Sequence, residues 1–196
     1  MPNALHSGRS ASLPAGRSTR APVQKSGGAG AAPRIDAEGY FDGYASLFGV
    51  ADLGRDVVMP GAFRASLAQR TAIGVKQLWQ HDPRNPVGEW LEIAEDQRGL
   101  RVLGRLDLEL PKARELHRLI TRGSVDGLSI GFKAESEKHD PETGLRRLEK
   151  LDLWEISIVS FPLLPQARIA PRGDGRGPLG SGAHASASSR RRMAQF

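Results

Sequence analysis

The sequence contains no cysteine. Disulfides, zinc sites built on thiolates and catalysis by a cysteine nucleophile are therefore excluded, and nothing argues for an oxidising compartment. Long apolar runs are missing too, since none approaches the roughly 20 residues needed to span a bilayer, and the amino-terminal residues lack the apolar stretch of a secretory signal. We therefore expect a cytoplasmic protein without a membrane segment.

Aromatic residues are scarce, at 6% of the 196 residues, and hydrophobic residues make up 39%. Both fractions are low for a chain that folds throughout. Residues 1–34 and 171–196 consist mostly of Gly, Ala, Ser, Pro and Arg. Such segments bury too little apolar surface to offset their loss of conformational entropy. The sequence predicts one domain over residues 35–170, between a disordered tail at 1–34 and a disordered basic tail at 171–196.

The formal net charge of +6 is of the sign found in proteins that bind nucleic acid. Much of the excess lies in the two tails, however, and the predicted domain lacks a platform of basic and aromatic residues on which bases could stack. We interpret the charge as solvated tails and expect no specific nucleic-acid binding. A basic nucleic-acid-binding protein is the alternative, and it predicts salt-sensitive DNA binding by the folded region.

Apolar patterning within residues 35–170 predicts mainly strands. We expect strands at residues 38–50, 56–59, 73–80, 86–93, 99–108, 127–137 and 145–161, and amphipathic helices at 62–70 and 111–122. Strands mostly follow strands here without a helix between them, which disfavours a parallel, doubly wound sheet. We therefore predict a mainly β (α+β) fold, an antiparallel, closed or nearly closed β-barrel of about seven strands with a few helices packed outside.

Three polar residues stand out in apolar surroundings. His81 ends a strand and precedes Asp82-Pro83, Ser129 lies between two glycines in Gly127-Leu128-Ser129-Ile130-Gly131, and Glu155 lies inside an apolar strand. The glycines leave the serine hydroxyl uncovered, and a carboxylate in an apolar strand needs a partner. A serine, an imidazole base and a carboxylate that orients the base are the components of a serine hydrolase.

Each of these residues also has a structural interpretation. His81 could cap its strand or bond Asp82, Ser129 could be a small residue on a packed sheet face, and Glu155 could pair with an arginine. Ser124 is the rival nucleophile, although the turn out of a helix explains it better. The substitutes for the carboxylate are Asp82, Asp126 and Asp152.

Other chemistries have no motif to support them. The sequence holds no His-Glu-x-x-His motif, no phosphate-binding loop and no dinucleotide fingerprint, so we expect no metal, nucleotide or organic cofactor. The letters of residues 127–131 match the Gly-x-Ser-x-Gly elbow of α/β-hydrolases, but the segment continues as a strand instead of turning into a helix. An α/β-hydrolase is therefore disfavoured.

Five motifs, taken in order, resemble the prohead maturation proteases of tailed bacteriophages, a family with relatives in prophages and gene transfer agents. The motifs are Gly43-Tyr44-Ala45-Ser46-Leu47-Phe48, Pro60-Gly61-Ala62-Phe63, His81-Asp82-Pro83 with Pro86-Val87-Gly88, Gly127-Leu128-Ser129-Ile130-Gly131-Phe132, and Glu155-Ile156-Ser157-Ile158-Val159. They cover the whole predicted domain, and their order makes them more specific than any one motif alone.

This resemblance implies a serine endopeptidase similar in fold to the herpesvirus assemblins, which acts inside the immature capsid in the host cytoplasm. It implies cleavage of scaffold and major capsid protein precursor segments, self-cleavage, and self-association within the prohead. By motif, Ser129 would be the nucleophile and His81 the general base, while Glu155 would replace the second histidine of the herpesvirus relatives. The alternative is a catalytically inactive β-barrel scaffold or interaction module for capsid assembly.

Overall fold

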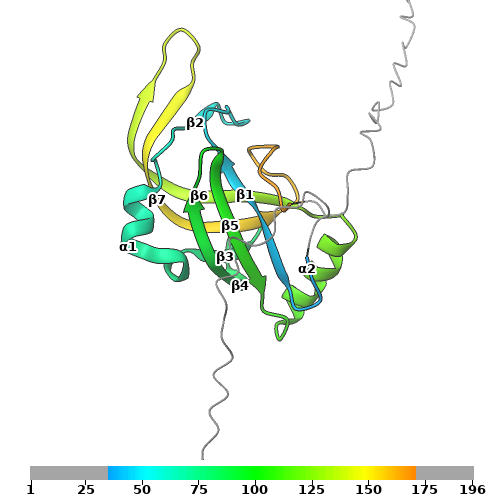
Figure 1. The fold of residues 1–196 in the computed structure, drawn as a ribbon. Helices are drawn as coiled ribbons and strands as arrows, with labels where there is room; N and C mark the ends of the chain where they lie inside the picture. The colour runs from blue at the N-terminus through cyan, green and yellow to red at the C-terminus, as the bar shows by residue number, and fades with distance from the viewer. Residues whose placement is uncertain (1–34, 171–196) are drawn as a thin grey trace, which may run out of the picture. The chain divides into compact units, whose positions relative to one another are not determined.

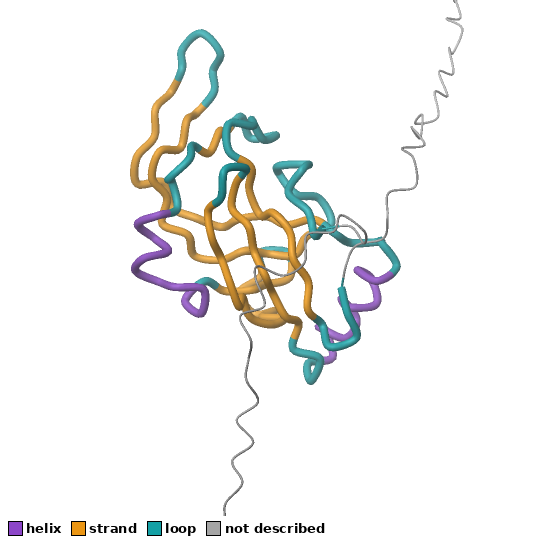
Figure 2. Tube along the Cα trace, viewed as in Figure 1, coloured by secondary structure: helices purple, strands orange, loops and turns teal. Residues whose placement is uncertain are grey.

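The computed structural model describes residues 35–170, so the predicted tails at 1–34 and 171–196 lie outside the described residues. The described part contains β1 (Tyr40–Leu47), β2 (Asp56–Val58), α1 (Arg64–Gly74), β3 (Lys76–Trp79), β4 (Asp82–Glu95), β5 (Gly99–Leu106), α2 (Pro111–Thr121), β6 (Gly127–His139) and β7 (Arg146–Val159). The strands form one curled sheet, with α1 and α2 on opposite sides of it (Figures 1 and 2).

The predicted strands and helices are confirmed in kind and in order, with shifts at their ends. The two largest shifts concern the end of α1, which is Gly74 rather than residue 70, and the start of β4, which is Asp82 rather than residue 86. Residues 73 and 74 are therefore helical, where the start of a strand was predicted. Asp82 pairs with Trp79 directly after a two-residue turn, so the ladder starts earlier than the two prolines of this segment suggested. Neither helix in residues 35–170 is long and apolar enough to cross a membrane.

The expectation of an antiparallel, closed or nearly closed barrel is wrong on both points, the strand direction and the closure. β7 pairs in parallel with β2 and with β3, so the sheet is mixed. Its order is β1-β5-β4-β3-β7-β2, with β6 paired to the other edge of β7. β1 and β6 form no ladder with each other; two isolated bridges to Arg168 and Ile169 link them only at one end. The sheet is therefore a curled half-barrel.

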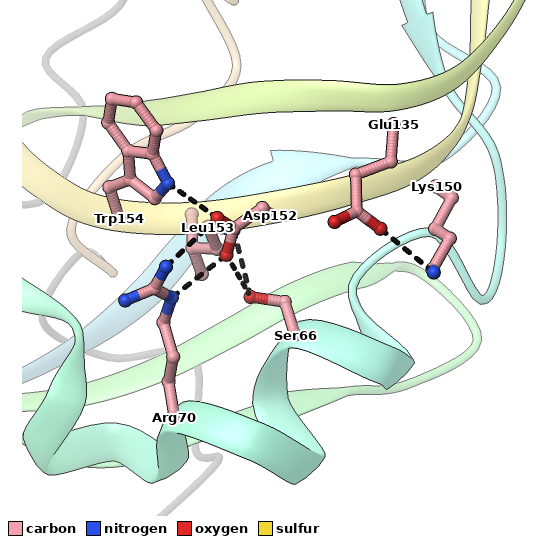
Figure 3. Close-up of polar contacts among 7 residues, drawn as sticks. All are labelled: Ser66, Arg70, Glu135, Lys150, Asp152, Leu153 and Trp154. Atoms are coloured by element: carbon pink, nitrogen blue, oxygen red, sulfur yellow. Dashed lines mark hydrogen bonds and ion pairs between the residues drawn. The ribbon is translucent and has the colours of Figure 1, made fainter.

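The parallel pairing depends on α1, which lies beside β7 in the gap between β2 and β3 (Figure 3). The Leu151 N–H donates to the carbonyl of Ala62, and the Leu153 N–H donates to Ser66 Oγ at 2.8 Å. Arg70 pairs with Asp152 at 2.8 Å. A buried N–H without a partner would destabilise the fold. These contacts satisfy β7 where neither β2 nor β3 pairs with it, so the strand continues between the two ladders.

A β-bulge at Trp154 changes which face of β7 is buried. Glu155 pairs with Gly131 and Leu153 pairs with Phe132, so Trp154 has no residue opposite it. Leu153 and Ile156 are both fully buried, whereas Trp154 is 51% exposed. Strict alternation would have placed Glu155 on the face that Leu153 buries. The bulge shifts the alternation by one residue, and it places Glu155 on the face opposite the core.

The core lies inside the curl of the sheet and under α2. α2 buries Ala113, Leu116 and Ile120 there, and the Trp90 ring meets Phe41 edge-on, with their centroids 5.7 Å apart. Burying a side chain of this size stabilises the fold by about 1.5–3 kcal/mol. This packed core holds β3, β6 and β7, the strands that carry the candidate site.

Candidate active site

His81 lies in a two-residue turn between β3 and β4. Gln80 and His81 both have positive φ angles, +54° and +58°, as hairpin turns of type I′ require. Such turns favour Asn-Gly, because a larger side chain in the left-handed region costs roughly 1–2 kcal/mol. β7 secures the turn: the Gln80 N–H donates to the Ile158 carbonyl, and the His81 N–H donates to Ser157 Oγ at 3.0 Å.

The ring of His81 contacts Glu155 directly. Its Nδ1 lies 2.6 Å from Glu155 Oε1, and the exposed fractions of the two side chains are 43% and 13%. This hydrogen bond is the main reason that the pKa of His81 is raised above 6.5; partial burial opposes the shift, and the carboxylate charge adds to it. A carboxylate at Nδ1 requires a proton there, so the neutral ring keeps Nε2 free to accept one.

Gly131 on β6 provides the space for this carboxylate. It pairs with Glu155 across the two strands. A Cβ atom at this position would lie 2.7 Å from Glu155 Cδ and 2.9 Å from Cγ, inside the 3.4 Å at which ordinary contact begins. The Glu155 side chain therefore lies flat against the backbone of β6, which directs it towards the His81 turn.

Ser129 lies on the same sheet face, two residues before Gly131. It pairs with Ser157 and is 6% exposed. Side chains of directly paired residues lie on one face, with Cβ atoms about 4.5–5.5 Å apart, and Ser157 in turn bonds the His81 backbone. No hydrogen bond joins Ser129 to His81 within residues 35–170. Such bonds are often long before substrate binds.

A cavity of about 260 Å³ borders Ser129. Its walls are mostly apolar, and they include the ion pair of Asp56 with Arg146, in which Nε and Oδ1 are 2.7 Å apart. His81 and Glu155 are not among the lining residues. Ser129 is thus the residue shared by the cavity and by the face that carries His81 and Glu155.

The alternatives raised by the sequence have other partners. The substitute carboxylates are bonded as follows: Asp82 to Arg84 and Asn85, Asp126 to Arg168, and Asp152 to Arg70 and Trp154. Hydrogen bonds from Arg84 lower the pKa of Asp82 to about 2. Ser124 lies in the turn after α2, where its N–H donates to the Leu119 carbonyl. The partner of Glu155 is His81 rather than an arginine.

Sequence reasoning missed the roles of Ser157 and Gly131. Ser157 Oγ donates to Glu155 Oε2 at 2.6 Å and also accepts the His81 N–H. The spacing Glu155-x-Ser157 was a usable signal, because residues two apart on a strand share a face. The sequence shows Gly131 only as a neighbour of Ser129, because its close approach to Glu155 depends on the β6–β7 register.

These residues are the components with which serine hydrolases activate a hydroxyl: a histidine bonded to a carboxylate, and a buried serine on the same sheet face. Residues 35–170 contain no group of three or more His, Asp or Glu side chains placed to hold a metal ion. The geometry thus defines a candidate site of the serine-hydrolase class.

Comparison with known proteins identifies the family. The family model for the caudovirus prohead serine protease matches residues 31–175, so the chain belongs to this family, as its five motifs predicted. The prohead protease of Enterobacteria phage HK97 is 36% identical over 135 residues, which are 68% of this chain and 60% of the relative. The prohead protease of Escherichia phage T5 is 29% identical over 85 residues, 43% of this chain and 40% of the relative.

A third curated relative and two solved structures are also similar to this chain. A capsid polyprotein of Pseudomonas phage PAJU2 is 33% identical over 98 residues, 47% of this chain and 15% of the relative. The capsid assembly protease of bacteriophage T4 is similar in fold, with a TM-score of 0.50, 14% identity, and coverage of 68% of this chain and 90% of that one. The KSHV protease has a TM-score of 0.46 at 16% identity, covering 67% and 63%. The chain spans at most 60% of the curated relatives named here.

Proposed function

We propose that this protein is a serine endopeptidase of phage capsid maturation, with Ser129 as nucleophile, His81 as general base and Glu155 as the residue that orients the base. The observation that carries the proposal is the 2.6 Å contact of His81 Nδ1 with Glu155 Oε1, on the face where Ser129 pairs with Ser157. Family membership supports the same assignment, because the matching family is one of serine proteases.

The chemistry follows the acyl-enzyme route. His81 Nε2 takes the proton of Ser129 Oγ as the oxygen attacks the peptide carbonyl, and then gives it to the departing amine when the C–N bond breaks. Water deprotonated by the same nitrogen hydrolyses the ester and regenerates the serine. Glu155 keeps the proton on Nδ1 and stabilises the imidazolium formed in each step.

The substrates of this peptidase are precursor segments of the major capsid protein or of the scaffold, and the enzyme's own chain. It acts within the prohead in the host cytoplasm, where self-association and packing beside the substrate raise the local concentration. The names of the relatives support this substrate class, since two are prohead proteases and one is a capsid polyprotein.

Coexpression of the full chain with the capsid precursor of the same genome tests the proposal. The intact protein should shorten the precursor, and Ser129→Ala should reduce the cleavage rate by at least about 10³-fold. The control is Ser136→Ala, which removes an exposed hydroxyl from the same strand and should leave the rate unchanged. Cleavage by Ser129→Ala at the normal rate would refute the assignment of Ser129 as nucleophile. Capsid assembly in which the intact protein cleaves nothing would favour the inactive scaffold module.

A further inference from the structure

We infer that Ser157 is a positioning residue of the proposed peptidase: its hydroxyl holds both the backbone of His81 and the carboxylate of Glu155, and so fixes the base relative to Ser129. This inference rests on the proposed function and adds a residue to it. It is carried by two hydrogen bonds that meet on the hydroxyl oxygen of Ser157, a fully buried residue near the carboxyl-terminal end of β7.

The two hydrogen bonds use different capacities of the hydroxyl. Ser157 Oγ accepts the N–H of His81 at 3.0 Å and donates its proton to Glu155 Oε2 at 2.6 Å. The other oxygen of the same carboxylate, Oε1, lies against His81 Nδ1. A closed ring of contacts thus runs from the His81 backbone through Ser157 and Glu155 to the His81 ring. Neither the turn nor the carboxylate can move without breaking one of these bonds.

The strain of the turn makes this support necessary. Gln80 and His81 both have positive φ angles, an arrangement that persists in non-glycine residues when the surroundings hold it in place. The hydrogen bond from the His81 N–H to Ser157 is one such constraint on His81, and the bond from Gln80 Nε2 to Ser160 Oγ, at 2.9 Å, holds the residue before it. If Ser157 lost its hydroxyl, the turn could relax and carry the imidazole away.

Ser157 also lies directly opposite the proposed nucleophile. Ser157 pairs with Ser129 on β6 and with Leu78 on β3. It therefore lies between the strand that bears the nucleophile and the strand that leads to the base. A small residue at this point keeps the face open between Ser129 and His81, and its hydroxyl keeps the base in reach.

A matched control is a second buried serine that bonds the backbone of β7 from helix α1. Ser66 of α1 is also buried, at 4% exposure, and its hydroxyl accepts the Leu153 N–H of β7 at 2.8 Å. It lies beside Arg70 and Asp152 (Figure 3), and within residues 35–170 it forms no hydrogen bond with His81 or Glu155. Ser66→Ala and Ser157→Ala each remove one buried hydroxyl that supports a backbone N–H.

The experiment measures the second-order rate at which a fluorophosphonate labels the purified full chain, from pH 5 to pH 9. This probe reports how well the serine is activated without requiring the cleavage sequence. Ser157→Ala should label roughly 10–100-fold more slowly than the intact protein, because a displacement of about 1 Å costs this much. The apparent pKa of the acid limb in its pH profile should fall towards the ordinary pKa of histidine. Ser66→Ala should label normally, and Ser157→Thr, which keeps the hydroxyl, should recover most of the rate.

The outcomes separate this inference from the proposed function. If the intact protein labels at Ser129 while Ser157→Ala labels as fast and with the same pH profile, the inference is overturned and the proposed function stands. An equal loss in Ser66→Ala and Ser157→Ala would also overturn it, because general destabilisation would then explain both. If the intact protein does not label, the proposed function fails and the inference with it. Thermal unfolding of each variant checks that it is folded.

Discussion

The substitution Gly131→Ala tests the packing of Glu155 against β6. The new methyl carbon would lie closest to Glu155 Oε1 and 2.7 Å from Cδ, against the 3.4 Å at which ordinary contact begins, so the carboxyl group has to retreat by more than about 0.7 Å or adopt another rotamer. Either movement displaces Oε1, which lies 2.6 Å from His81 Nδ1. The distance between these two atoms then reaches or exceeds the roughly 3.2 Å limit of a good hydrogen bond.

The expected loss of activity is about 10²–10⁴-fold. The lower figure corresponds to a base misplaced by about 1 Å, and the upper one to a histidine that loses the carboxylate fixing its tautomer. Stability should fall only by about 1–3 kcal/mol, as in other overpacked sites. The control is Gly54→Ala in an exposed turn, where the added carbon would meet only the Asp52 side chain, at 3.2 Å.

A double-mutant cycle decides whether the loss acts through Glu155. The measured quantity is the fluorophosphonate labelling rate of Gly131→Ala, of Glu155→Gln and of the two combined. Because both changes remove the same contact, the combined variant should be about as slow as the slower single variant. If the losses of the two single variants multiply in the combined variant, Gly131 acts independently of Glu155 and the proposed packing effect is wrong. Normal labelling by Gly131→Ala would refute it outright.

Two further predictions concern pH and the core. The raised pKa of His81 means that the stability which the protonated ring gains from Glu155 is fully present below pH 6.5 and is lost as the pH rises through the raised value. Labelling needs the neutral ring, which keeps its Nδ1 proton on Glu155, and should rise over the same interval. An unfolding free energy and a labelling rate that rise together across this interval would contradict this prediction. Leu153→Ala should lower the unfolding free energy by about 2–5 kcal/mol because Leu153 is fully buried, while Trp154→Ala, at a residue 51% exposed, should lower it much less; denaturant titration measures both, and equal losses would contradict the bulge.

The sequence supported prediction of the elements but not of their pairing. Apolar patterns and turn residues located the strands and helices, as in α2, where Pro111 opens the helix and the buried stripe is Ala113, Leu116 and Ile120. The parallel pairing of β3 with β7 was missed, because it depends on α1 carrying the chain across one edge of β7. Such a long-range arrangement leaves no periodic pattern in the local sequence.

The site was predictable residue by residue but not in its geometry. His81 and Glu155 were chosen as polar residues in apolar strands, and the structure brings them into contact. The face that Glu155 occupies could not be derived, because a bulge at Trp154 shifts the alternation of β7. The hydrogen bond from the His81 N–H to Ser157 was missed for a different reason, because it forms only when the β3–β4 turn is folded against β7.

The location of the covalent adduct decides whether Ser129 is the nucleophile. After the full chain is labelled with a fluorophosphonate, peptide mass mapping identifies the modified residue, and the same labelling is measured for His81→Ala. The account predicts one adduct, on the Ser129 oxygen, and labelling at least about 10³-fold slower without the imidazole. An adduct on another serine, or undiminished labelling of His81→Ala, would contradict it.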